Sequence, residues 1–258
     1  MATNVQSLLL DRNEVLTSST AFANELLTDL LSIPDLATYL RAELKIVPLT
    51  VNQVIYEPGD QIDYVYFPLD SVISDLSITE DGTTIETSMV GREGVVGVST
   101  LLDSGCSRQW IWVTVSGNAI QLKAKLLDRL LIHNATALKS FFRYYRSLII
   151  QLSQRCVCNT RHTILERLCC WLLMIHDRVG ETKLSLTHEM IASRVGARRA
   201  GITVAAGMLQ EMNAIAYRRG RVHIGNREAL TSAVCECYNN MQTDSRPTAP
   251  PPVGTFSL

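Results

Sequence analysis

Two short runs of arginine occur in the C-terminal third of the chain. Arg198 and Arg199 form one run, and Arg218, Arg219 and Arg221 form the other. The planar guanidinium group donates two parallel hydrogen bonds to a phosphate or to the edge of a guanine. Closely spaced arginines therefore indicate a surface that binds nucleic acid.

The local charge supports this interpretation. Residues 180–230 hold eight Lys and Arg residues against four acidic residues, whereas the whole chain has a net charge of −1. A basic face on a chain that is not basic overall is typical of phosphate binding. The alternative is an ordinary helical hairpin whose arginines are solvated, and the focused positive charge disfavours it.

The residues around the arginines predict a helix, a tight turn, a second helix and a short hairpin. Thr187 is a suitable N-cap for the first helix, and Gly196 suits the turn because glycine adopts left-handed backbone angles easily. The first arginine run opens the second helix, whose expected buried side consists of Ile202, Ala205, Ala206 and Leu209. Two β-type segments, 215–217 and 222–224, flank the second run. This order is typical of a winged helix-turn-helix, whose second helix enters the DNA major groove.

Length and composition predict a two-domain cytoplasmic protein. The chain has 258 residues, 47% of them hydrophobic, which is enough to bury a substantial core. No stretch approaches the roughly 20 apolar residues of a membrane helix, and the start lacks a basic segment followed by an apolar run.

The seven cysteines are predicted to be buried and reduced. Cys156 and Cys158 lie two residues apart on a predicted helix, so their side chains point about 200° apart and cannot share a ligand. The same argument applies to Cys235 and Cys237, and the chain contains no Cys-x-x-Cys pair. We therefore expect no metal and no cofactor.

Sequence periodicity predicts the fold class α+β. Short β-branched and aromatic segments, separated by turn signals such as Asp81-Gly82, are typical of an antiparallel roll or barrel. Helical periodicity precedes and follows them. The expected segments are an N-terminal helical segment (1–45), an antiparallel β-roll (46–125), a long dimerisation helix (126–160), a winged helix-turn-helix domain (161–240) and a disordered Pro-rich tail (241–258).

The predicted long helix carries a heptad seam. From Leu131 and Ala135 onward, apolar residues recur in alternating steps of four and three residues. A period of 3.5 residues favours a coiled-coil contact with a second copy, although a long core helix packed on the roll would also bury apolar residues. We predict a homodimer, because a two-fold protein matches two DNA half-sites. The predicted interface residues are Leu138, Phe142, Tyr145, Ile149, Leu152 and Cys156.

Several short motifs add a family resemblance over roughly residues 26–238. The most specific are residues 56–60, 65–68, 90–97, 171–180 and 198–207. Together with the order of the elements, they resemble the Crp/Fnr family of bacterial transcription regulators, within a subgroup that has a degenerate cyclic-nucleotide pocket. The resemblance implies that the roll (46–125) is a cyclic-nucleotide-binding-like jelly roll that acts as the effector or sensor domain. It also implies relay through the long helix, promoter binding by the second helix of the motif, and RNA polymerase as a partner.

The ligand pocket implied by the resemblance departs from the cyclic-AMP-binding pattern. In those members a Gly-Glu-Leu turn and an Arg-Ser pair hold the ribose and the cyclic phosphate. The matching residues here are Gly97, Val98, Ser99, Arg108 and Gln109. Valine cannot accept a hydrogen bond from a ribose hydroxyl, and the unpaired polar group costs about 1–3 kcal/mol. We expect an unidentified small-molecule effector other than cyclic AMP, or no ligand.

The second helix also departs from the family pattern. Members that bind TGTGA-like sites place an arginine, a glutamate and a second arginine on its exposed positions, which correspond here to Arg199, Ala200 and Val204. We expect Arg199 to bind guanine O6 and N7 and the Ala200 methyl to contact a thymine methyl. The further predicted DNA contacts come from Thr187, His188, Arg198, Thr203, Arg218, Arg219 and Arg221.

An enzyme is not expected. A metal site in a cupin-like roll needs histidines within residues 46–123, and none of the five histidines lies there. The chain also lacks a nucleophile motif and a phosphate loop, and Asp75 and Glu80 are expected to be solvated.

Two alternatives fit the same residues. One is a regulatory module that binds a small molecule or a partner protein without binding DNA specifically, which the arginines of the helix and hairpin disfavour. The other is a thiol-based regulator in which Cys156 forms a disulfide across the dimer seam.

Overall fold

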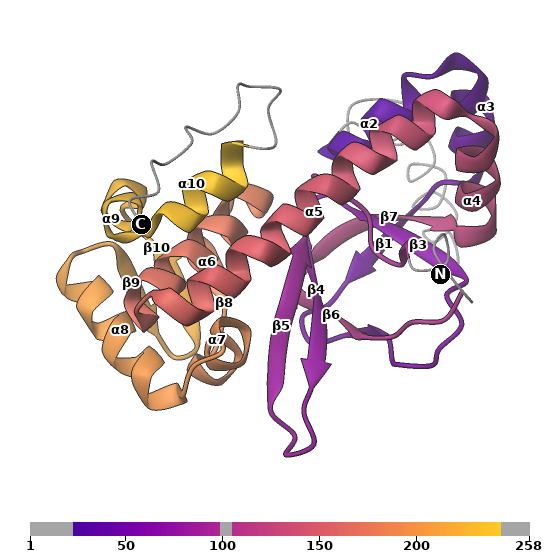
Figure 1. Cartoon of the computed structure of the whole chain (residues 1–258). Coiled ribbons are helices and arrows are strands. Elements are labelled where there is room, and N and C mark those ends of the chain that lie inside the picture. Colours follow the sequence, from indigo (N-terminus) through magenta and orange to yellow (C-terminus); the bar gives the residue numbers. More distant parts are fainter. Residues whose placement is uncertain (1–22, 99–104, 244–258) are drawn as a thin grey trace, which may run out of the picture.

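The computed structural model describes residues 23–98 and 105–243. A β-rich lobe and a helical lobe are joined by one long helix that crosses both (Figure 1). Ser99, residues 1–22 of the predicted N-terminal segment, and the predicted tail beyond residue 243 lie outside the described residues.

The β-rich lobe is an antiparallel roll, as the periodicity predicts. Two helices, α2 (Glu25–Leu31) and α3 (Pro34–Glu43), precede it. One sheet has the strand order β1-β7-β3 and the other β2-β6-β4-β5, and every pair is antiparallel. The strands are β1 (Lys45–Leu49), β2 (Val54–Tyr56), β3 (Tyr64–Pro68), β4 (Val72–Ile78), β5 (Thr84–Val90), β6 (Trp110–Val115) and β7 (Gly117–Lys123).

The hairpin between β4 and β5 forms at the predicted Asp-Gly turn. Gly82 has a φ of +81°, in the left-handed region that glycine adopts readily. The Asp81 carboxylate accepts a hydrogen bond from the backbone N–H of Thr83 at 3.0 Å. This turn sets the register of β5 on β4, and the register decides which β5 side chains face the helices.

The predicted long helix is two helices, because the chain breaks at Asn134. α4 (Ala124–His133) ends there and α5 (Ala135–Arg161) begins. The Asn134 side chain caps α5 by accepting hydrogen bonds from the backbone N–H groups of Thr136 and Ala137. The predicted seam residue Leu131 therefore belongs to α4, and the seam within α5 starts later than predicted.

α5 has two apolar faces. One is buried on its own chain and includes Ala137, Phe141 and Tyr144. The other carries Phe142 and Ile149, whose exposed fractions are 58% and 53%. The sequence left open whether the helix packs on its own domain or on a second copy, and the structure assigns different residues to the two surfaces.

The helical lobe contains the predicted winged helix-turn-helix. Its sheet has the order β8-β10-β9, and its first strand was not predicted. No helix among the described residues combines the length and apolar character needed to cross a membrane. The elements are α6 (Ile164–Val179), β8 (Lys183–Ser185), α7 (His188–Val195), α8 (Arg199–Glu211), β9 (Ile215–Arg218), β10 (Arg221–Ile224), α9 (Arg227–Ala233) and α10 (Glu236–Thr243).

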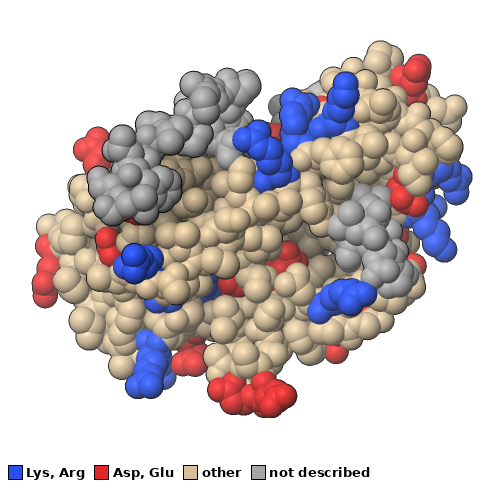
Figure 2. Space-filling model, viewed as in Figure 1, with Lys and Arg blue, Asp and Glu red and all other residues tan. Residues whose placement is uncertain are grey.

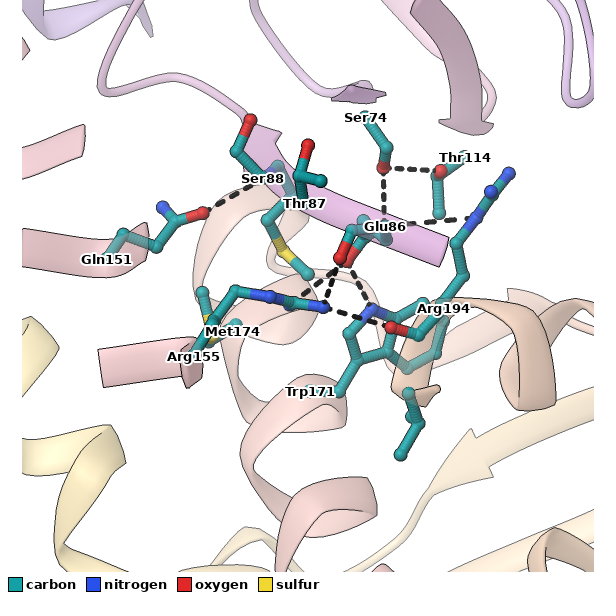
Figure 3. Close-up of polar contacts among 12 residues, drawn as sticks. Ser74, Glu86, Thr87, Ser88, Thr114, Gln151, Arg155, Trp171, Met174 and Arg194 are labelled. Carbon is teal, nitrogen blue, oxygen red and sulfur yellow. Dashed lines mark hydrogen bonds and ion pairs between the residues drawn. The ribbon is translucent and has the colours of Figure 1, made fainter. Parts of the chain in front are cut away.

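A buried carboxylate, Glu86 of β5, joins the two lobes (Figure 3). Its side chain is 0% exposed, and its Oε1 accepts hydrogen bonds from Arg155 of α5 at 3.1 Å and from the indole of Trp171 in α6 at 2.9 Å. Ser74 of β4 donates to Oε2 at 2.6 Å. A buried charge needs such partners, because an unpaired one is strongly destabilising.

Two arginines extend this junction to α7. Arg155 donates to the backbone carbonyls of Glu86 and Arg194 at 3.0 and 2.9 Å. The Arg194 guanidinium lies 3.8 Å from Glu86 Oε2 and over the ring of Trp112 in β6. The sheet, the long helix and the first helix of the helix-turn-helix thus meet at one carboxylate.

A second ion pair joins the lobes at the opposite end of β5. Glu93, in the loop after β5, accepts hydrogen bonds from the Arg178 guanidinium of α6 at 2.7 and 2.8 Å. The two partners lie 85 residues apart along the chain, so this pair could not be predicted from one sequence.

Replacing Glu86 with glutamine tests the junction. The amide keeps the shape of the carboxylate but leaves the Arg155 charge without its buried partner, so Glu86→Gln should lower the free energy of unfolding by about 3 kcal/mol. Urea unfolding followed by tryptophan fluorescence measures it. The exposed hairpin variant Glu80→Gln should stay within about 0.5 kcal/mol of the wild type. Equal midpoints for both variants would contradict the role of Glu86.

Candidate DNA-binding and effector sites

The second helix of the motif, α8, has the buried and exposed faces that the sequence predicts. Its buried residues are Ile202, Ala205, Ala206 and Leu209, which confirms the predicted set. The predicted contact residues Arg199, Ala200 and Thr203 lie on the exposed face. Val204 joins them and is 65% exposed. An apolar side chain held in water on a basic helix suits contact with a thymine methyl group.

The start of α8 presents the two predicted arginines to solvent. Arg198 is the N-cap residue and its side chain makes no capping bond. Arg199 lies 4.0 Å from Glu189 of α7, and both side chains are more than two-thirds exposed. An exposed pair of this kind contributes little stability, so Arg199 is available to another anion.

The turn between α7 and α8 is held from α6. Gly196 adopts left-handed angles at the end of α7, as predicted. Arg167 of α6 donates to the backbone carbonyls of Val195 and Gly196. A cation at these carbonyls satisfies acceptors that a helix end leaves without partners. The angle between the two helices is thereby fixed.

His188 lies between the helices and the hairpin. Its ring stacks on Tyr217 of β9 at 4.1 Å, and its Nδ1 lies 3.1 Å from the Thr203 hydroxyl. Its Nε2 is enclosed. Burial, helped by the nearby Arg199, lowers the pKa of His188, which favours the neutral ring. A direct contact between His188 and DNA, which the sequence predicts, would require the ring to turn out.

The three predicted arginines of the wing lie around the β9–β10 turn. Arg218, Arg219 and Arg221 are all exposed. Arg219 and Gly220 have φ values of +49° and +73°, which is the pattern of a tight hairpin turn. The hairpin therefore projects three guanidinium groups from a short, rigid support.

The predicted effector pocket exists as a cavity of about 430 Å³ between the roll and α5. Gly97, Val98, Arg108 and Gln109 all line it, so the structure brings the described members of the predicted set together. Four residues of α5 form the opposite wall: Tyr144, Tyr145, Leu148 and Leu152. Tyr145 and Leu152, predicted as interface residues, thus also face the pocket.

The cavity has polar groups that the sequence did not assign to it. Asp75 of β4 accepts a hydrogen bond from the Ser88 hydroxyl, and Gln109 donates to the Thr87 hydroxyl at 3.1 Å. Burial raises the pKa of Asp75 to about 6. The prediction that Asp75 is solvated is wrong, because its strand register turns it toward the cavity. Glu80 is exposed, as predicted.

A second hollow, of about 780 Å³, separates the β4–β5 hairpin from the DNA-binding motif. Asp81 and Gly82 line one side, and Glu189, Arg198 and Arg199 line the other. Figure 2 shows acidic side chains gathered at the lower tip of the hairpin. The basic start of α8 therefore borders an acidic part of the β-rich lobe.

The position of Asp75 predicts a pH effect on stability. Because the folded protein raises the pKa of Asp75 from 3.8 to about 6, the folded state loses stability as the pH rises between about 4 and 6, and stays less stable above that. Asp75→Asn removes this penalty and should raise the free energy of unfolding at pH 7.5 by about 3 kcal/mol, with no gain at pH 4. Urea unfolding at both pH values measures it, and a uniform loss of stability would contradict the assignment.

Comparisons with known proteins agree with this architecture. The model of the Crp-like helix-turn-helix domain matches residues 166–233. A global nitrogen regulator of Synechococcus elongatus is 24% identical over 200 residues, which cover 72% of this chain and 90% of that protein. A global nitrogen regulator of Nostoc is 24% identical over 182 residues, covering 67% and 82%.

Solved structures show the same fold. The structure of FixK2 from Bradyrhizobium japonicum has a TM-score of 0.62 at 15% identity and covers 74% of this chain and 98% of its own. A CRP-family transcriptional regulator of Thermus thermophilus, TTHB099, has a TM-score of 0.60 at 16% identity, covering 72% and 95%. Residues 166–233 thus form a Crp-like helix-turn-helix domain, and the chain as a whole, with a β-roll, a long connecting helix and this domain in order, has the fold of the Crp/Fnr transcription regulators and resembles them in sequence.

Proposed function

We propose that the chain acts as a homodimer that binds a two-fold symmetric DNA operator and is controlled by a small molecule other than cyclic AMP. The observation that carries the proposal is the exposed apolar stripe of α5. It runs along the helix that also closes the pocket and reaches the DNA-binding lobe (Figure 1). α5 therefore connects the proposed dimer interface, the pocket and the DNA-binding lobe.

The stripe supports dimerisation because water exposure of large apolar side chains is unfavourable. Phe142, Ile149 and Leu152 are 58%, 53% and 37% exposed. Their spacing of seven and three residues places them on one helix face, next to Cys156, which is also exposed. Figure 2 shows a largely uncharged surface along the lower half of α5. A second copy of α5 would cover this stripe and give the two-fold axis.

The DNA-binding residues support reading of one half-site per protomer. The exposed face of α8 offers one guanidinium, from Arg199, and the methyl groups of Ala200 and Val204. Arginine favours guanine, and methyl groups favour thymine. Arg198 and the wing arginines are suited to the flanking phosphates. In a two-fold dimer the half-sites would lie about one helical turn apart, on the same side of the duplex.

The pocket supports an effector with both polar and apolar parts. Val98 stands where a ribose-binding glutamate would be, so a ribose hydroxyl would find no acceptor there. Asp75, Arg108 and Gln109 offer acceptors and donors, and the α5 wall is aromatic and aliphatic. An effector in this cavity would contact the dimerisation helix directly.

As a promoter-binding regulator, the protein would act in the cytoplasm together with RNA polymerase.

Charge on the stripe tests dimerisation. The double substitution Phe142→Glu with Ile149→Glu places two carboxylates in the proposed interface, so the variant should sediment as a monomer where the wild type sediments as a dimer. Thr136→Glu, an exposed change on the opposite side of the same helix, should remain dimeric. A monomeric wild type, or a dimeric double variant, would refute the interface.

Two arginine variants test DNA reading. Arg199→Ala should weaken binding to the operator by about 1–3 kcal/mol and relax the preference at one base position, because a guanine contact is lost. Arg219→Ala should weaken binding to all DNA sequences alike. It should also reduce the slope of log affinity against log salt concentration by about one. Titrations on operator and random duplexes at several salt concentrations measure both. If Arg199→Ala lost equal affinity for both duplexes, its role as a base contact would be refuted.

A further inference from the structure

Four side chains that bind soft metals converge where the end of α5 meets the start of α10. They are Cys158 in the last turn of α5, His162 directly after α5, Cys235 directly before α10, and Cys237 in the first turn of α10. Each offers one sulfur or ring nitrogen, and these four atoms all lie within 4.8 Å of one another. The three cysteines are buried.

We expected no metal here because Cys235 and Cys237 would point apart as neighbours on one helix, and the fold removes that condition. Cys235 instead lies before the first residue of α10, after the extended residue Val234, so the helical angle does not separate the two side chains. Cys158 and His162 are four residues apart and therefore share a face of α5. Cys156 points away and is exposed.

The distances fit one tetrahedral ion. The sulfurs of Cys158 and Cys235 are 3.6 Å apart, and the sulfur of Cys237 lies 3.6 Å from His162 Nδ1. A tetrahedral zinc ion with zinc–sulfur bonds of about 2.3 Å and zinc–nitrogen bonds of about 2.0 Å has edges of roughly 3.5–3.8 Å. Two of the six donor–donor distances thus already match the spacing that a bound ion would impose, and the other four are no longer than 4.8 Å.

The histidine is oriented as a metal ligand. Its Nδ1 faces the sulfur of Cys237, and its Nε2 lies 3.3 Å from a carboxylate oxygen of Glu236. In metal sites the second ring nitrogen of a histidine ligand donates to a carboxylate, which fixes the ring and raises its basicity. Glu236 supplies this partner from the residue between the two C-terminal cysteines.

The donor set also indicates which metal the site would take. Thiolates are the species that coordinate, and a Cys₃His set selects soft tetrahedral ions, of which zinc is the usual one.

We propose that these four side chains bind one Zn²⁺ ion and thereby fasten α10 to the end of α5. Four protein ligands leave no open position, so the ion would be structural rather than catalytic. At this corner the three cysteines and the partly buried Met241 form a small apolar cluster, and the ion would add to the stability of that cluster. The proposal is independent of the effector and of the operator.

Metal analysis of the purified full-length protein tests the site. Protein produced without a histidine tag and with zinc in the medium should contain one zinc per protomer by plasma mass spectrometry. Cys235→Ser and His162→Ala should each lower this content to less than a fifth. Cys156→Ser, on the same helix two residues from a proposed ligand, should keep it. A wild type without zinc, or ligand variants that retain it, would overturn the proposal.

Cobalt substitution covers the case in which a ligand variant fails to fold. Wild-type protein refolded with Co²⁺ should show the intense visible bands of tetrahedral, sulfur-rich cobalt, and these should disappear when zinc is added. An octahedral cobalt spectrum would overturn the proposal. So would a disulfide between Cys158 and Cys235, found by peptide mapping of protein purified without reductant, in place of bound metal.

Discussion

A carboxylate buried without solvent contact must be surrounded by donors, and this requirement shapes the centre of the molecule. Glu86 has three such donors from three elements, Ser74, Arg155 and Trp171. Removing any one of them leaves a charge that the low-polarity interior stabilises poorly. The sheet, α5 and α6 are therefore held in one relative position, and α7 follows because Arg155 also binds the Arg194 carbonyl.

The same geometry offers a route from the proposed effector to DNA. Thr87 and Ser88, the next residues of β5 after Glu86, line the pocket. On the opposite wall Leu152 lies three residues before Arg155 on α5. A ligand that moved either wall would change the contacts of Glu86 and so the setting of α7. The hypothesis requires two arrangements of β5, α5 and α7. The effector would have to bind one arrangement more tightly at the pocket, and DNA would have to bind one more tightly at the helix-turn-helix.

Patterns that repeat along the chain predicted much of the fold. The bounds of β4 and β5 follow from alternation and the Asp81-Gly82 turn, and the buried face of α8 follows from helical spacing. Asn134, the N-cap of α5, was not predicted as a helix boundary because the apolar heptad pattern continues across it. The three-residue strand β8 is too short to carry a pattern and exists because β10 pairs with it.

Contacts between distant residues could not be predicted from one sequence. Glu86 and Trp171 are 85 residues apart, and Cys158 and Cys235 are 77 apart. Asp75 was expected to be a solvated acid of the hairpin, but the register of β4 turns its side chain toward the cavity. The candidate DNA contacts stay predictions, and they could be named from the sequence because the chemistry of an exposed arginine does not depend on distant partners. The pocket residues of the roll, by contrast, were predicted only from the family resemblance. The pocket residues of α5 were identified only in the folded structure.

Selection of bound duplexes from a random pool tests the central claim most directly. The purified wild-type protein is incubated with the pool at moderate salt, and recovered sequences are read after several rounds. The account predicts enrichment of a two-fold symmetric motif whose half-sites lie about one helical turn apart and contain guanine and thymine at fixed positions. An enriched motif without symmetry, or affinity for random duplexes equal to that for the recovered pool, would contradict it.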